Sequence, residues 1–280
     1  MLFRSVTRRL PEAQRAAVSF RRGEVTDPAS LPAALEGVDA VVHLVAIARD
    51  WDGGRSLARL NTGGTRNMVD AAKAAGVRRF VHMGALAVED REELHYASSK
   101  KRAERYVEES GLDWTVVKPS LIWGPRDGFF NILAGLVRMS PLIVPVPGDG
   151  KARFQPIAAT DVARAFRLCL ERPESIGQEY LIGGPTYWTY TEVVQEVCRG
   201  LGTTRRTLPM PLPVIRLVAG VSEAIRLPFP VATDQLRQLA LDNIGPLDGY
   251  ERAFGVPPRA MDGQLGYLRR KLRDQEPTAG

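Results

Sequence analysis

The sequence has few of the residues and segments that mark several protein classes. Its 280 residues include two cysteines, Cys169 and Cys198, and no zinc-ligand spacing, which argues against a disulfide scaffold and a metal centre. No apolar run reaches the roughly 18 to 20 residues of a membrane-spanning helix, and the N-terminus lacks the apolar segment of a secretory signal. We therefore expect a folded cytoplasmic protein.

The basic residues are not concentrated in one place. The formal net charge is +6, with 38 Lys and Arg against 32 Asp and Glu, but the basic groups are spread along the chain and lack the interleaved aromatics of nucleic-acid binders. We interpret the surplus as a solvated surface and expect no nucleic-acid partner. Hydrophobic residues at 44% and charged residues at 25% are typical of a globular fold.

Short apolar runs alternate with amphipathic stretches, which is typical of a parallel sheet covered by helices. We expect strands at residues 18–20, 40–46, 80–83, 114–117, 142–146 and 180–182, and helices over residues 28–35, 61–75 and 96–109 and from residue 160. Helical segments dominate after Tyr190. The sequence thus predicts a doubly wound α/β domain over residues 1–185, to which some later segments return, and a small, mainly helical cap or substrate-side lobe over residues 186–280.

An apolar stretch punctuated by prolines runs from Pro209 to Pro230 within the expected cap. Arg216, Glu223 and Arg226 interrupt it, which favours packing inside the cap. The alternative is a surface for a membrane or a protein partner, which would make the protein membrane-peripheral.

A Tyr and a Lys stand four residues apart in Tyr96-Ala97-Ser98-Ser99-Lys100, at the start of an expected helix. That spacing puts both side chains on one helix face, where an ammonium can favour a phenolate and make the Tyr an acid or base near neutral pH. Because Tyr-x-x-x-Lys arises often by chance in helices, its meaning depends on the surrounding motifs.

Five separated motifs in a fixed order supply that context. They are Gly23–Asp27; His43–Ile47; Asn61, Gly64, Thr65 and Asn67; Gly111–Thr115 with Lys118–Ser120; and Gln155–Ile157 with Asp161–Ala163. With them, the chain from about Val6 to Leu268 resembles the short-chain dehydrogenase/reductase superfamily. Within it the chain is similar to the atypical group related to the NAD(P)H-binding accessory subunit of respiratory complex I and to NmrA-like proteins.

The resemblance implies an NAD(P)-binding Rossmann-type domain in which Tyr96 and Lys100 are the catalytic residues and no metal takes part. Glu24 and Val25 correspond to the positions beside the adenine. The other cofactor-binding positions that the resemblance implies are Arg8, Arg9, Val45, Ala46, Ile47, Asn61, Lys100, Pro119, Ser120 and Ile122.

By the same resemblance, different positions are expected to contact different parts of the cofactor. Residues 45–47 correspond to the strand end that passes the ribose, and the loop after residue 118 to the one that approaches the nicotinamide. Arg8 or Arg9 would meet the 2′-phosphate if the cofactor is NADP rather than NAD. These residues also have a purely structural interpretation. Asn61 could fix loops, Glu24 could be an exposed turn residue, and the neighbouring His43 could be a buried residue of an apolar strand.

The sequence departs from the superfamily pattern at the expected serine. Gly84-Ala85-Leu86 follows the strand after which a reductase normally has a Ser, and neither Gly84 nor Ala85 can donate a side-chain hydrogen bond to a carbonyl. Tyr96 then either protonates an oxygen or only contacts the cofactor, while Lys100 binds ribose hydroxyls.

A second departure is the absence of Gly-x-x-Gly-x-x-Gly, the turn that places a pyrophosphate on a helix N-terminus. We expect the sheet to lack its first strand and this loop, and the chain as written to bind a dinucleotide weakly or not at all. Met1–Ser5 also matches the translated end of a common sequencing adapter. We therefore expect the sequence to be part of a longer protein.

Two functional hypotheses remain open from the sequence. The first is an NAD(P)-binding oxidoreductase or epimerase with Tyr96 as acid or base and a small-molecule substrate. The second is a non-catalytic cofactor sensor, or an assembly or accessory subunit of a respiratory or regulatory complex. The Tyr96–Lys100 pair favours the first, and Gly84-Ala85 favours the second.

Overall fold

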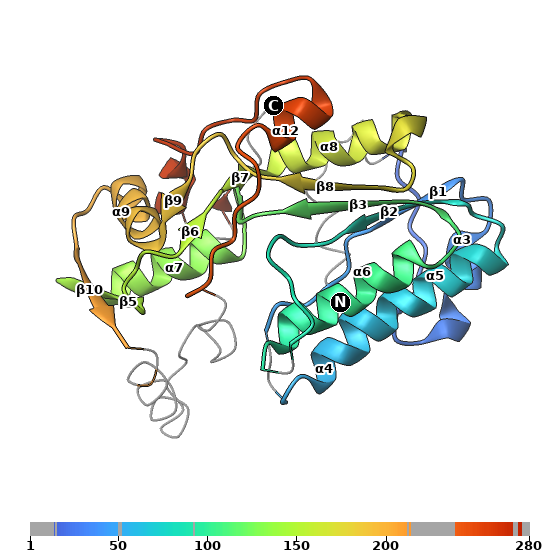
Figure 1. Ribbon diagram of the computed structural model, residues 1–280, viewed down its shortest axis with the longest axis horizontal. Helices are drawn as coiled ribbons and strands as arrows, with labels where there is room; N and C mark the ends of the chain where they lie inside the picture. Colours follow the sequence, from blue (N-terminus) through green and yellow to red (C-terminus); the bar gives the residue numbers. More distant parts are fainter. Residues whose placement is uncertain are drawn as a thin grey trace.

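The computed structural model describes residues 14, 16–49, 52–91, 93–211, 213, 239–270 and 274–275. Its central element is a four-stranded parallel sheet (Figure 1) of β1 (Ala40–His43), β2 (Arg79–Met83), β3 (Asp113–Pro119) and β8 (Gln178–Ile182), in the order β1-β2-β3-β8. These strands lie where the expected apolar runs lie. Buried parallel strands are apolar on both faces, which makes them easy to recognise.

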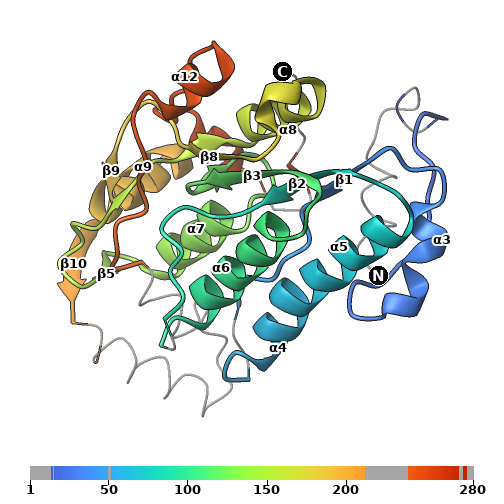
Figure 2. The same ribbon diagram turned by 45° about the vertical axis from the view of Figure 1, so that its right-hand side comes forward.

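Helices cover both faces of this sheet. On one face lie α3 (Pro32–Leu35), α5 (Gly64–Ala74) and α6 (His95–Glu108), and Figure 2 shows α5 and α6 side by side below the strands. On the other face lie α8 (Ala159–Glu171) and the short α12 (Gly249–Phe254) (Figure 1). The chain therefore has a Rossmann-like, doubly wound α/β fold.

Two short helical segments precede the long helix α5. A short helix α4 (Arg55–Leu57) and a π-helical segment η2 (Ala58–Gly63) lead directly into α5. The helix ends before Gly76, whose φ of 75° places it in the left-handed region that favours glycine. The C-cap is Ala75, and Gly76 directly after it ends the helix.

A second lobe packs around its own hydrophobic core. Its helices are α7 (Phe129–Met139), α9 (Tyr190–Leu201) and η4 (Leu265–Arg269), and its strand pairs are β5 (Ile143–Pro147) with β10 (Arg206–Met210), β4 (Ile122–Trp123) with β7 (Ile157–Ala158), and β6 (Arg153–Phe154) with β9 (Trp188–Thr189). Phe130, Val146, Val194 and Leu265 belong to this core. The lobe therefore draws on residues from both sides of position 185.

The expected strand at residues 18–20 is not formed, and the side chains of Val18 and Phe20 are exposed. In the part of the chain that the structure describes, β1 pairs with β2 on one side only. Within the described residues, no strand lies where residues 18–20 could pair with it. This explains why the predicted strand is not formed.

Two further expectations need correction. The expected helix over residues 28–35 is divided into η1 (Pro28–Ser30) and α3, because the ring of Pro32 cannot donate a backbone hydrogen bond. The strand near residue 143 pairs with β10 and not with the central sheet. After Tyr190 helices dominate among the described residues, as expected, and β10 is a strand among them. The short helix η3 (Pro173–Ser175) precedes β8.

None of the helices in the described residues combines the length and the hydrophobicity that a membrane crossing requires.

Candidate active site

A small cavity of about 150 Å³ lies at the carboxyl ends of β2 and β3. Crevices outside the carboxyl ends of parallel strands are the usual ligand sites of doubly wound folds. Its lining residues are Ala85, Leu86, Ala87, Val88, Leu94, Tyr96, Pro119, Ser120, Leu121, Phe154, Leu239, Leu241, Asp242 and Asn243. Most of this lining is apolar, and the Tyr96 phenol is among its few polar groups.

The turn after β2 forms one wall of the cavity, and its backbone is unusual. Ala87 has a φ of 54°, a left-handed conformation that residues with a β-carbon rarely adopt. Conformations of this kind persist where the surrounding structure enforces them, and they cluster at functional sites. The strained turn therefore supports this cavity as the candidate site.

A larger cavity of about 400 Å³ lies in the second lobe, away from the Tyr-Lys pair, and three arginines line it. Arg138 donates to the carbonyl of Leu268, Arg205 Nε to that of Ser140 at 2.8 Å, and Arg269 Nε to that of Gly200 at 2.9 Å. These carbonyls lie near helix C-termini, where positive charge is favourable. The arginines therefore have a structural role that accounts for their presence.

Tyr96 lies in the first turn of α6 and is half-buried against the cavity. Burial raises its pKa to about 12, with a smaller contribution from the charge of Glu104. The sequence-based expectation that Lys100 would favour the phenolate is therefore wrong, because burial dominates. At neutral pH Tyr96 is a protonated phenol, which can donate a proton.

Lys100 is buried one helical turn further along α6, as the motif spacing predicted. Its Nζ donates to the carbonyl of Met83 at the end of β2. Burial lowers its pKa to about 8, while the charge of Glu104 acts in the opposite direction. The ammonium thus fixes the end of β2 beside the cavity.

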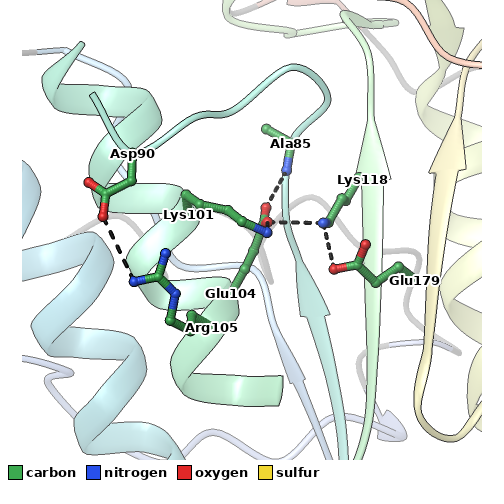
Figure 3. Close-up of polar contacts among 7 residues, drawn as sticks. All are labelled: Ala85, Asp90, Lys101, Glu104, Arg105, Lys118 and Glu179. Atoms are coloured by element: carbon green, nitrogen blue, oxygen red, sulfur yellow. Dashed lines mark hydrogen bonds and ion pairs between the residues drawn. The ribbon is translucent and has the colours of Figure 1, made fainter. Parts of the chain in front are cut away.

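A charge network around the buried Glu104, behind the cavity wall, was not found by sequence reasoning (Figure 3). The side chain of Glu104 is 0% exposed, and its Oε2 lies 3.1 Å from Lys118 Nζ and 3.6 Å from Lys101 Nζ. Lys118 Nζ also lies 2.6 Å from Oε1 of Glu179 on β8. Two features of the sequence could have indicated this network: Glu104 follows Lys100 by four residues, and Lys118 lies inside an apolar strand.

A third carboxyl, that of Glu108, adjoins this network. Burial and a hydrogen bond with Glu179 raise its pKa to about 7. The carboxyl groups of Glu104, Glu108 and Glu179 lie close enough together to hold a cation. Lys118 already brings positive charge to two of them.

Asn61 connects the loop after β1 to α6. Its Oδ1 accepts from the Ile47 amide at 2.8 Å, and its Nδ2 donates to the Ile47 carbonyl at 2.9 Å and to Ser99 Oγ at 3.0 Å. Both amide hydrogens therefore have protein acceptors. Asn61 holds residues 45–47 in place, of which Ala46 is exposed while Val45 and Ile47 are half-buried.

Glu24 and Val25 form a tight turn before η1. Thr26 donates its amide and its hydroxyl to Glu24 Oε1 at 3.2 and 3.0 Å, and these bonds lower the pKa of the exposed Glu24 carboxyl. Val25 is buried against Gly64, and its carbonyl accepts from Asn67 Nδ2 at 2.8 Å. The structure therefore brings two of the family-like motifs into contact.

Pro119 and Ser120 lie in the cavity wall, whereas Ile122 is in β4 and does not line the cavity. Ser120 Oγ lies 2.7 Å from Asn243 Oδ1 and accepts a hydrogen bond from the backbone amide of Gln155 at 3.0 Å. The C-terminal part of this wall, residues 239–243, was not predicted. Arg8 and Arg9 lie outside the described residues.

Two stacked histidines lie below the site. His43 on β1 and His82 on β2 have ring centroids 5.4 Å apart, and His43 Nε2 lies 3.1 Å from Thr65 Oγ1. Burial lowers the pKa of His43 to about 4 and that of His82 well below its usual value, with Lys100 acting in the same direction. Both rings are therefore neutral at pH 7, which fits a structural role.

The described residues fit one half of a nicotinamide dinucleotide. The cavity is lined by Tyr96 and Ser120 at the carboxyl ends of β2 and β3, where the nicotinamide ribose would be met. Lys100 does not line it and bonds to the Met83 carbonyl at the end of β2. Among the same residues there is no glycine-rich turn that could hold the pyrophosphate. The fit is therefore to the nicotinamide half.

Comparisons with known proteins agree with this geometry. Residues 1–128 match the family model described as NAD(P)H-binding. The chain is 26% identical over 253 residues, 88% of its length, to the mitochondrial NADH dehydrogenase (ubiquinone) 1 alpha subcomplex subunit 9 of Mus musculus. It is 28% identical over 221 residues, 70% of its length, to the 2-alkyl-3-oxoalkanoate reductase of Stenotrophomonas maltophilia.

These matches cover 65% of the mouse protein and 66% of the bacterial one, so the chain spans about two thirds of the length of these curated relatives. Among solved structures, a nucleoside-diphosphate-sugar epimerase from Staphylococcus aureus aligns with a TM-score of 0.71 at 22% identity, over 92% of this chain and 87% of that one. That likeness shows a shared fold. Residues 1–128 therefore match the NAD(P)H-binding family, and the chain as a whole is similar to NAD(P)-binding reductases and epimerases.

Proposed function

We propose that the protein is an NAD(P)-dependent oxidoreductase that acts on a carbonyl or alcohol group of a largely apolar molecule. The observation that carries this proposal is the cavity at the carboxyl ends of β2 and β3, whose wall combines apolar side chains with the Tyr96 phenol. A nucleotide-sugar pocket would need many hydrogen-bonding groups, because buried polar groups of a ligand must find partners.

Tyr96 supplies the proton in the proposed reaction. A reduced nicotinamide, when bound, would supply the hydride for the carbonyl carbon. Because its pKa is about 12, the phenol is protonated at neutral pH and can give its proton to the developing oxyanion. The alcohol leaves with both hydrogens, and the phenolate regains a proton from solvent. Lys100 keeps the end of β2 in place through the Met83 carbonyl.

A second candidate is a non-catalytic cofactor sensor or accessory subunit. Gly84 and Ala85 provide no hydroxyl to polarise a carbonyl, and the mouse relative carries the name of a complex I subunit. The Lys100 ammonium also faces a protein carbonyl. This candidate predicts cofactor binding without turnover.

The choice of cofactor is a further part of the proposal. We propose NADP if Arg8 or Arg9 meets the 2′-phosphate, and NAD otherwise. We also propose that residues 1–280 alone bind either dinucleotide weakly, because the sequence has no Gly-x-x-Gly-x-x-Gly turn. The proposed location is the cytoplasm, with any membrane or protein contact made through residues 209–230.

Steady-state turnover distinguishes the two candidates. NADPH or NADH oxidation at 340 nm is followed with three substrate classes: quinones, aliphatic ketones and nucleotide sugars. Because we propose weak dinucleotide binding, the cofactor concentration is raised until the rate no longer increases. The oxidoreductase proposal predicts turnover with an apolar quinone or ketone. Saturable cofactor binding with no turnover in any class would contradict it and support the accessory role. Turnover with nucleotide sugars alone would contradict the apolar substrate class.

A further inference from the structure

One carboxylate joins the two strand ends that border the cavity. Glu104 Oε1 accepts from the Ala85 amide at 3.3 Å, and its Oε2 lies 3.1 Å from Lys118 Nζ (Figure 3). Ala85 is part of the cavity wall, and Lys118 directly precedes the wall residues Pro119 and Ser120. Moving the Glu104 side chain would therefore move both walls.

The space for this carboxylate exists because residue 84 is glycine. A β-carbon at Gly84 would lie 2.6 Å from Glu104 Oε1 and 2.9 Å from Lys118 Cγ, closer than real β-carbons approach other atoms. This is the turn at which the superfamily pattern expects a serine. Gly84 and Glu104 thus form a complementary pair: the carboxylate occupies the volume that a side chain would need.

Glu104 also continues the line of functional side chains on α6. Tyr96, Lys100 and Glu104 follow at four-residue intervals and therefore share one helix face. The charged groups around Glu104 come from all the packed elements; they are Lys100, Lys101 and Glu108 on α6, Lys118 on β3 and Glu179 on β8.

We propose that Glu104 is a positioning residue of the reductase site, which holds the Gly84–Ala85 turn and the Lys118–Ser120 strand end so that the Tyr96 phenol faces the cavity. The proposal rests on the proposed function for what the cavity does. The contacts of Glu104 with Ala85 and Lys118 are present whatever the protein's function is. Glu104 acts through other residues and does not touch the substrate.

The charge of Glu104 has a consequence that a purely structural side chain would not have. It raises the pKa of Tyr96, in addition to the larger effect of burial, and it opposes the lowering of the Lys100 pKa. Replacing the carboxylate by an amide should therefore shift both pKa values downward. Tyr96 would then be a stronger acid and a less completely protonated donor at alkaline pH.

The test compares Glu104→Gln with Glu109→Gln in the full chain. Glu109 is the exposed C-cap of the same helix, so its variant makes the same change of charge away from the network. NMR of ¹³C-labelled tyrosine gives the Tyr96 pKa, with the signal assigned by Tyr96→Phe. We expect a downward shift in Glu104→Gln and none in Glu109→Gln. Equal values in all three proteins would overturn the proposal.

A second variant covers the case in which Glu104→Gln does not fold. The double variant Glu104→Leu/Lys118→Met replaces a buried ion pair by apolar side chains, a change that proteins often tolerate. We expect it to fold, to lower the Tyr96 pKa and to speed hydrogen exchange of the Ala85 amide, which loses its acceptor. Unchanged exchange at Ala85 would overturn the positioning role.

Turnover separates the failure of this inference from the failure of the proposed function. If the pKa and exchange shifts occur but no substrate is turned over by the native chain, Glu104 still positions the site and the oxidoreductase proposal fails. If the native chain turns over substrate and Glu104→Gln changes neither kcat nor the Tyr96 pKa, the positioning inference fails. We expect a loss in kcat with little change in KM.

Discussion

The carboxylate of Glu104 leaves no room for a β-carbon at residue 84. Gly84→Ser, which would restore the serine of the superfamily pattern, should therefore destabilise the protein by about 1 to 3 kcal/mol and give no increase in turnover. Urea denaturation measures the loss. Gly135→Ser is the matched control, because a β-carbon at Gly135 meets nothing within 4 Å. A Gly84→Ser protein as stable as the native one, with faster turnover, would refute this explanation.

The two stacked histidines make stability depend on pH. Their pKa values are lower in the folded protein than in the unfolded chain, so below pH 6.5 the unfolded chain binds protons that the folded one does not. Stability is therefore lost as the pH falls from about 6.5 to 4. Each pKa unit is worth about 1.4 kcal/mol, so His43, with a pKa of about 4, accounts for roughly 3 kcal/mol of this loss.

His82→Leu tests this account in isolation. Neither ring nitrogen of His82 has a hydrogen-bond partner among the described residues. Because an unpartnered buried polar group is costly, an apolar side chain of similar size should raise stability at pH 7 by about 1 kcal/mol or more. It should also flatten the dependence on pH between 6.5 and 4. Chemical denaturation across that range would show a steeper or equal slope if the account is wrong.

At the scale of single elements, α6 shows what a sequence pattern can and cannot predict. The helix was expected over residues 96–109 and spans His95–Glu108. Its buried face carries Lys100 and Glu104 together with Ala97 and Val107, whereas amphipathic patterning assigns charged residues to the solvent side. The Tyr-Lys pair could therefore be found as a motif, and its buried carboxylate partner could not.

The start of α9 gives a prediction about local stability. Glu192 and Thr189 form a capping box, in which the Glu192 amide donates to Thr189 Oγ1 at 3.2 Å and the Thr189 amide to Glu192 Oε2 at 2.7 Å. Thr189→Ala should cost about 1 kcal/mol of unfolding free energy. Thr204→Ala, in an exposed loop, is the control and should cost close to nothing. Equal losses in urea unfolding would rule out the cap as the cause.

At the scale of the whole molecule, Gln155 joins segments that are far apart in the sequence. Its Nε2 donates to the Gly184 carbonyl at 2.9 Å and its Oε1 accepts from the Gly245 amide at 2.9 Å, and the side chain is fully buried. Gln155→Leu leaves these groups without partners and should cost about 3 kcal/mol or more. The exposed Gln178→Leu should cost little. Similar thermal midpoints for the two variants would contradict this role.

Features formed by residues close together in the sequence could be predicted, and contacts between residues far apart in the sequence could not. The strands and helices of the central sheet are local apolar patterns, and the Tyr96–Lys100 and Asn61 motifs lie within single elements. The far wall of the cavity depends on Ser120 meeting Asn243, more than a hundred residues along the chain. No local pattern encodes that contact. The small strand pairs of the second lobe escaped prediction for the same reason.

The most direct test of the account is the effect of removing one hydroxyl from the cavity. Tyr96→Phe should lower kcat by roughly 10²- to 10⁴-fold with the substrate that the native protein turns over, because the proton donor is lost. Tyr106→Phe is the control on the same helix, since the Tyr106 hydroxyl donates to Asp70 at 2.7 Å and does not line the cavity. We predict that Tyr106→Phe keeps native turnover. Native turnover in Tyr96→Phe would contradict the assignment of this cavity as the active site.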